Sequence, residues 1–92
     1  MTAPAQITLL TQPSCSMCTH AKSVLHRLKQ EYRLSIQELD LTSPDGQQLA
    51  SRAGVMFAPG LLLDGQMFSF GRVPERKLRR ALDRRQAEPP VG

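Results

Sequence analysis

The chain has 92 residues, of which 40% are hydrophobic, and this length supports one domain with a single core. No apolar run approaches the roughly 20 residues of a membrane-spanning helix, and the first residues lack the basic and apolar pattern of a secretory signal. Two cysteines are too few for the disulfide scaffold of a small secreted domain. We therefore expect a cytoplasmic protein without membrane contact.

The chain has a formal net charge of +4, and its excess of basic residues lies in the carboxyl-terminal segment, with seven Arg and Lys residues between positions 72 and 85. Such a segment is either the solvated face of an amphipathic helix or a surface for an acidic partner or nucleic acid. The partner hypothesis rests on Arg76, Arg79 and Arg80. Because no aromatic residues alternate with the basic ones, we do not expect nucleic acid binding.

The apolar pattern predicts strands and helices that alternate along the chain and end in a hairpin and a helix. Apolar residues spaced by three and four predict a helix over 16–31, and Ser43-Pro44 with a later Gly54 is typical of a helix start and end. Asp64-Gly65 between apolar runs predicts a tight hairpin. In chain order we expect a strand at 7–10, a helix at 16–31, a strand at 34–41, a helix at 44–53, strands at 61–63 and 67–70, and a helix at 74–85.

This βαβαββα order predicts the architecture. A strand, a helix and a strand form a parallel pair with a right-handed crossover, and the later hairpin is antiparallel. We expect an α/β fold with a four-stranded mixed sheet and helices on both faces. The domain spans 6–85, and the small, proline-bearing ends 1–5 and 86–92 are expected to be flexible tails.

Cys15 and Cys18 are the only cysteines, and they lie between the first strand and the first helix. In this setting a C-x-x-C pair is typical of a redox centre, because two thiols three residues apart can close into a disulfide and reopen. Helix amides and the helix dipole favour a thiolate on the first sulfur. Two alternatives are incidental thiols and a soft-metal carrier. We expect no metal site, since neither His20 nor His26 is spaced as a third ligand.

The element order, the cysteine pair after the first strand and a proline before the third resemble the thioredoxin superfamily. In length the chain is most similar to glutaredoxins and small glutaredoxin-like redoxins. The matching segments are 11–18, 54–59 and 63–65, within a span of about 6–85. The resemblance implies a thioredoxin-like fold and a thiol–disulfide oxidoreductase that reduces protein disulfides.

The two sulfurs are expected to have different roles. Cys15, exposed at the first residue of the helix, would be the attacking thiolate, and Cys18, one turn in and shielded, would resolve the mixed disulfide. The resemblance also implies a cis peptide bond before Pro59, with the backbone of Ala58 facing a substrate strand. We expect the aromatic side chains to pack in the core or the hairpin: Phe57, Phe68 and Phe70.

We expect no tightly bound cofactor; electrons would come from glutathione or a thioredoxin-reductase-type flavoprotein. Glutathione-using glutaredoxins are similar but usually carry a lysine where Gln12 stands and two glycines where Gly71-Arg72 stands. Because these departures remove groups that would hold glutathione carboxylates, we expect the flavoprotein to be the better donor.

A rival hypothesis from another class is a thioredoxin-like binding module. Its cysteine pair would hold a metal or be vestigial, and its basic carboxyl-terminal helix would dock a partner. We expect a monomer in either case.

Overall fold

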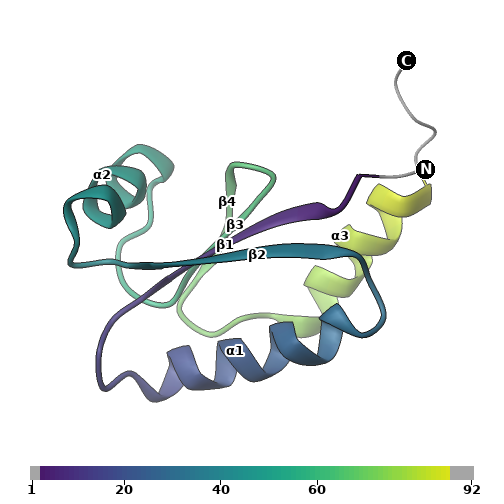
Figure 1. Cartoon of the computed structure of the whole chain (residues 1–92), viewed down its shortest axis with the longest axis horizontal. Helices are drawn as coiled ribbons and strands as arrows, with labels where there is room; N and C mark the ends of the chain where they lie inside the picture. Colours follow the sequence, from purple (N-terminus) through teal and green to yellow (C-terminus); the bar gives the residue numbers. More distant parts are fainter. Residues whose placement is uncertain (1–2, 88–92) are drawn as a thin grey trace.

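The computed structural model describes residues 3–87, which form a four-stranded sheet with three helices (Figure 1). The element order is the βαβαββα order that the sequence predicts. The elements are β1 (Ala5–Thr11), α1 (Ser16–Lys29), β2 (Leu34–Asp40), α2 (Pro44–Ala53), β3 (Gly60–Leu63), β4 (Gln66–Phe70) and α3 (Glu75–Ala87).

The sheet is mixed, with the strand order β2-β1-β3-β4. β1 and β2 are parallel, with Ile7 opposite Ile36, and β3 is antiparallel to both β1 and β4. The hairpin turns at Asp64 and Gly65, whose φ angles of 50° and 86° are both left-handed. Two such residues in a row suit a two-residue turn that matches the strand twist. The predicted hairpin is therefore confirmed.

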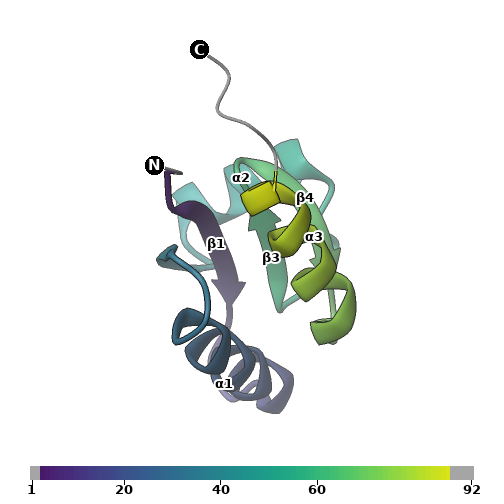
Figure 2. The same ribbon diagram turned by 90° about the vertical axis from the view of Figure 1, so that its right-hand side faces the viewer.

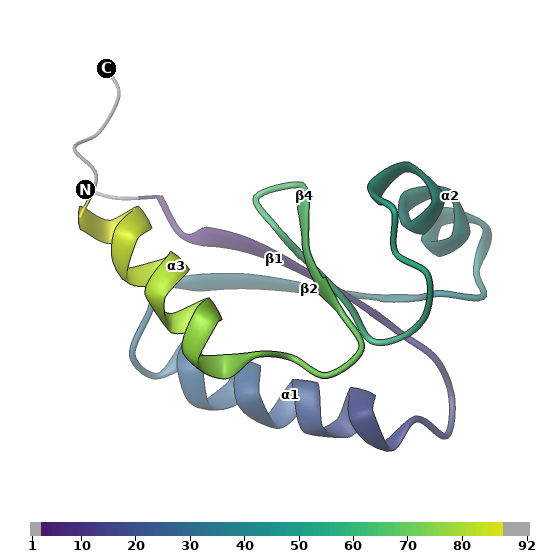
Figure 3. The same ribbon diagram turned by 180° about the vertical axis from the view of Figure 1, so that it is seen from behind.

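The helices cover both faces of the sheet, with α1 and α3 on one side and α2 on the other (Figures 1 and 3). Successive residues of a strand point to opposite faces. Leu9 accordingly packs with α1 and α3, whereas Leu10 packs with Ala50 of α2. Figure 2 shows α3 beside β3 and β4, where Leu78 joins the core of the first face. Within residues 3–87, no helix is long and apolar enough to cross a membrane.

The domain begins and ends slightly beyond the predicted limits. Ala5, expected in the amino-terminal tail, is the first residue of β1 and is buried. The Arg85 guanidinium donates hydrogen bonds to the carbonyls of Ala3 and Pro4, at 2.7 and 3.2 Å, so a side chain far along the chain holds this segment. At the other end α3 continues through Ala87. The remainder of both expected tails, residues 1–2 and 88–92, lies outside the described residues.

Candidate active site

Cys15 lies at the amino-terminal end of α1 as its N-cap residue. The chain leaves β1 at Thr11 and reaches Cys15 through Ser14, whose φ of 56° is left-handed. The amide of Cys18 donates a hydrogen bond to the Cys15 Sγ atom at 3.2 Å. The helix begins at Ser16, as in the predicted range 16–31, so Cys15, expected as the first helical residue, is instead the N-cap. The sulfur therefore takes the place of the side-chain oxygen that usually caps a helix.

The two thiols are free and lie in different environments. Cys15 is half-buried, whereas Cys18 is only 3% exposed. Burial raises the pKa of the Cys18 thiol, and the interaction with Cys15 raises it further, against a smaller lowering by the Gln12 backbone and the Lys22 charge. A reagent from solution therefore reaches the Cys15 sulfur, while Cys18 stays protonated behind it at neutral pH.

A polar group lies on the other side of Cys18, between α1 and β2. Lys22 is one turn beyond Cys18 on α1, and its Nζ atom lies 2.9 Å from an Oε atom of Glu38. The buried Thr11 hydroxyl donates a longer hydrogen bond of 3.4 Å to the same carboxylate. Lys22 is therefore half-exposed, pairs with Glu38 and supplies positive charge near the Cys18 thiol.

The peptide bond between Ala58 and Pro59 is cis, as the resemblance implies. Both residues are buried, and the exposed side chains of this loop are those of Met56 (77% exposed) and Phe57 (51% exposed). Phe57, expected in the core or the hairpin, is outside the core but packs on the hairpin, where its ring makes an edge-to-face contact with Phe70 of β4 at a centroid distance of 5.0 Å.

Phe57 and Met17 meet at Gly71, the residue that follows β4. A Cβ atom on Gly71 would lie 3.1 Å from the Phe57 ring and 3.9 Å from the Met17 methyl, and the Gly71 φ of 83° is left-handed. Met17, between the two cysteines, is 41% exposed. These three residues form an apolar rim at the start of α1. The position of Phe57 two residues before the cis proline is the sequence signal that could have placed it there.

The basic residues of α3 are not equivalent. Arg79 contacts Glu31 through two hydrogen bonds of 2.9 and 2.6 Å and also pairs with Glu75, so it joins α3 to the end of α1. Of the three arginines on which the partner hypothesis rests, Arg79 is thus held by two carboxylates, whereas Arg76 and Arg80 are exposed. Among the described residues, no three His, Cys, Asp or Glu side chains cluster as metal ligands would.

Residues 6–83, which include both cysteines, Pro59 and Gly71, match the family described as "Glutaredoxin-like domain (DUF836)". The chain belongs to this family. No curated protein sequence matches this glutaredoxin-like chain.

Solved structures show what this glutaredoxin-like domain is similar to in shape. A mutant thioredoxin from Halobacterium salinarum NRC-1 matches with a TM-score of 0.71 at 22% identity, over 94% of this chain and 78% of that one. The thioredoxin-like protein BC3987 matches with a TM-score of 0.62 at 21% identity, over 79% and 96%. At these identities the likeness concerns the fold, and it confirms the prediction of a thioredoxin-like fold.

Proposed function

We propose that this glutaredoxin-like protein is a thiol–disulfide oxidoreductase that reduces protein disulfides through Cys15 and Cys18. The observation that carries the proposal is the hydrogen bond of 3.2 Å from the Cys18 amide to the Cys15 sulfur at the N-cap of α1. A helix amide and the helix dipole favour negative charge on that sulfur. The second thiol of the pair is buried one turn behind it.

In the first step the Cys15 thiolate attacks one sulfur of the substrate disulfide. A bond forms between Cys15 Sγ and that sulfur, the substrate S–S bond breaks, and the other substrate sulfur leaves as a thiolate that takes up a proton. Accessibility favours Cys15 for this role, because Cys18 is 3% exposed. Exchange also requires the thiolate form, and the raised pKa of Cys18 holds that thiol protonated.

In the second step Cys18 loses its proton and its sulfur attacks Cys15 Sγ. The mixed disulfide breaks, the second substrate thiolate leaves, and an intramolecular Cys15–Cys18 disulfide remains. The substrate has gained two electrons and the protein has lost two. Lys22 supports this step, because its charge favours the Cys18 thiolate and opposes the effect of burial.

The substrate would lie across the loop that contains Ala58 and Pro59, with its backbone next to that of Ala58. The exposed side chains around this loop are apolar. Met17 and Phe57 would therefore contact apolar atoms of the substrate near its reacting sulfur.

Two electrons from an external donor would restore the dithiol, and we propose a thioredoxin-reductase-type flavoprotein in preference to glutathione. Gln12 is exposed and carries no charge, and Gly71 is followed by Arg72 rather than by a second glycine. The uncharged Gln12 therefore offers a glutathione carboxylate less than the lysine of glutathione-using glutaredoxins does, whereas Arg72 supplies a cation. The cytoplasm, a reducing compartment, would keep the dithiol ready to act.

The rival hypothesis, a binding module with a vestigial cysteine pair, accounts for the basic helix but gives no role to the contacts of the two thiols. A reachable sulfur on a helix amide and a shielded sulfur behind it suit exchange chemistry.

Turnover of a protein disulfide tests the proposal. The oxidised substrate is given to the protein with NADPH and thioredoxin reductase, and separately with glutathione and its reductase, and NADPH consumption is followed. We expect turnover in the first system to exceed that in the second, and none in either with Cys15→Ser. Absence of turnover in both would refute the oxidoreductase, whereas faster turnover with glutathione would refute only the choice of donor.

A further inference from the structure

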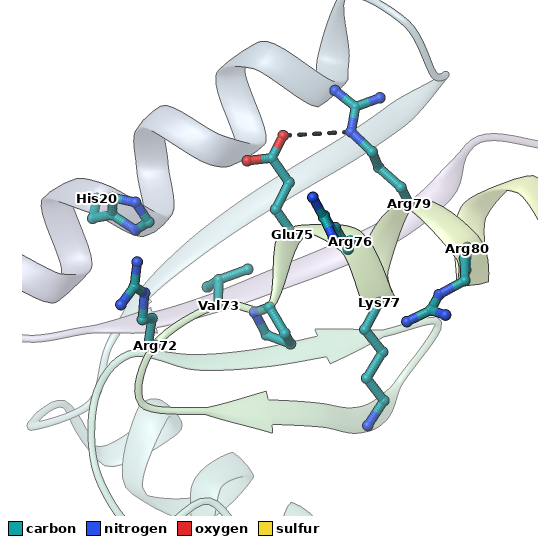
Figure 4. Close-up of a pocket in the computed structure, with 9 residues that line it drawn as sticks. His20, Arg72, Val73, Glu75, Arg76, Lys77, Arg79 and Arg80 are labelled. Atoms are coloured by element: carbon teal, nitrogen blue, oxygen red, sulfur yellow. Dashed lines mark hydrogen bonds and ion pairs between the residues drawn. The ribbon is translucent and has the colours of Figure 1, made fainter.

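A groove of about 810 Å³ lies between α1 and the start of α3 (Figure 4). Five cations and a single carboxylate line it: Arg72, Arg76, Lys77, Arg79, Arg80 and Glu75. His20 contributes from α1, and Val73 and Pro74 add apolar atoms. A concave surface with this charge concentrates anionic groups.

Only part of this charge is neutralised by the protein. Glu75 pairs with Arg27 at 2.8 Å and with Arg79, which also holds Glu31. Across residues 3–87, no ion pair joins Arg72, Arg76 or Arg80 to a carboxylate. The groove therefore keeps an excess of positive charge.

The positions of these cations are unfavourable for the helix itself. Arg76 and Lys77 follow Glu75 in the first turn of α3, where the helix dipole disfavours positive charge. Arg76 and Arg80 are four residues apart on the same helix, and like charges at that spacing repel. Charges that oppose local stability in two ways indicate a function outside the helix.

One end of the groove, at His20 and Arg72, lies near the start of α1, where Cys15 is the N-cap (Figure 4). His20, which lines it, is one turn of α1 beyond Met17, about 4.5 Å along the helix axis. On the opposite wall Arg72 directly follows Gly71, which lies beside the rim residues Met17 and Phe57. A chain whose sulfur meets Cys15 can therefore cross the apolar rim and enter the groove.

We propose that the groove binds an acidic segment of the protein whose disulfide is exchanged at Cys15, and so selects substrates with carboxylates close to the reacting cysteine. This inference rests on the proposed oxidoreductase function and names its substrate class. A polypeptide suits the groove better than a nucleic acid, because apolar Val73 and Pro74 accompany the charges and the lining residues include no Phe, Tyr or Trp for base stacking.

The test uses three disulfide peptides with the same core sequence. Two aspartates, two asparagines or two lysines are placed about two to six residues from the reacting cysteine. At low ionic strength we expect kcat/KM to be about tenfold higher for the acidic than for the neutral peptide. The preference should shrink as the salt concentration rises from about 0.01 M to about 1 M, because the Debye length falls from about 30 Å to about 3 Å.

Variants locate the preference on the protein. Arg76→Gln with Arg80→Gln should bring the ratio of acidic to neutral kcat/KM close to one, and Arg76→Glu with Arg80→Glu should favour the basic peptide. Inversion of the preference cannot result from unfolding. The matched control, Arg52→Gln with Arg84→Gln, removes the same net charge from residues outside the groove, and the ratio should remain unchanged.

The outcomes separate the two proposals. Equal kcat/KM for the three peptides, with good turnover of the neutral one, would overturn the groove and leave the oxidoreductase standing. An equal loss of preference in the control variant would also overturn it, since overall charge would then be the cause. If no peptide is turned over, the oxidoreductase fails. A single-stranded oligonucleotide that binds more tightly than the reduced acidic peptide, and loses that binding in the Arg76/Arg80 variant, would overturn the polypeptide occupant.

Discussion

The start of α1 differs from α3 in what its side chains contact. The side chains at the start of α1 are accessible to another molecule, whereas charged side chains of α3 form ion pairs within the chain. Around Cys15 the side chains are reachable, with Met17 and Phe57 exposed. Along α3, by contrast, Arg79 holds Glu31 and Arg85 holds Asp64.

This contrast indicates a division of work within one small domain. The ion pairs of α3 join segments that are far apart in sequence, whereas the start of α1 stays accessible to a second molecule. Functional sites commonly give up local stability in this way. Substitutions at the reactive end should therefore change chemistry with little effect on stability, and substitutions in the ion-paired region should do the reverse.

The largest expected effect is at the two sulfurs. Cys15→Ser should abolish disulfide reduction, because the remaining thiol is buried and protonated. Cys18→Ser should instead accumulate a mixed disulfide on Cys15, because the resolving sulfur is absent. Mass spectrometry of the trapped adduct and thermal unfolding of both variants check this. Retained activity in Cys15→Ser, with the adduct on Cys18, would reverse the assignment.

The next effect is on stability, at Arg85. Its guanidinium lies 2.7 Å from Asp64 and 2.7 Å from the Ala3 carbonyl, and its side chain is 24% exposed. Arg85→Gln should lower the free energy of unfolding by about 1 kcal/mol, since the partner carboxylate is partly solvated. For a domain of this size that corresponds to about 4–8 °C in Tm. Disulfide turnover should stay unchanged. Arg84→Gln is the matched control, and equal Tm losses in the two variants would contradict the role of Arg85.

Much of the fold and of the cysteine site could be predicted from the sequence, because the signals for them are local. The cysteine spacing, the proline before the third strand and the Asp64-Gly65 turn each lie within a few residues, and the structure contains the strand–helix junction, the cis bond and the hairpin. The helix start at Ser16 agrees with the predicted range, and Cys15, expected as the first helical residue, lies one position before it, within the usual uncertainty of a helix boundary.

The rest depends on contacts between distant parts of the chain. Arg76 and Arg79 have the same chemistry on one helix, and what separates them is Glu31, 48 residues before Arg79. The exposure of Phe57 likewise depends on where Gly71 and Met17 place the loop. Sequence periodicity carries no information on such pairs.

Acid should weaken the ion-paired region first. The hydrogen bond from Arg79 lowers the pKa of Glu31, and that from Arg27 lowers the pKa of Glu75. Burial raises the pKa of Asp64, but hydrogen bonds from Arg85 and the Gln6 amide outweigh it, and the net shift is downward.

A carboxylate with a lowered folded-state pKa stabilises the fold above its unfolded pKa, near 4, and that stability is lost as the pH falls through the folded value. Tm should therefore be steady above about pH 5 and fall below about pH 4. Arg79→Gln should make this acid fall shallower, and the control Arg76→Gln should not. If Tm fell equally steeply with falling pH in both variants, the proposed difference between Arg79 and Arg76 would be contradicted.

The smallest effect concerns Tyr32, whose hydroxyl donates a hydrogen bond of 2.6 Å to Asp83 of α3. That hydrogen bond raises the pKa of Tyr32, with smaller additions from burial and the Asp83 charge. The chain has one tyrosine and no tryptophan, so the alkaline absorbance change in the near ultraviolet, where thiolates do not absorb, reports this residue alone. We expect a midpoint above the ordinary value of about 10, and a return toward it in Asp83→Ala but not in Asp45→Ala. Because the folded-state pKa is raised, the hydrogen bond contributes its full stability below about pH 10 and loses it as the pH rises through the folded value. A midpoint that Asp83→Ala does not move would show that this contact with α3 does not persist in solution.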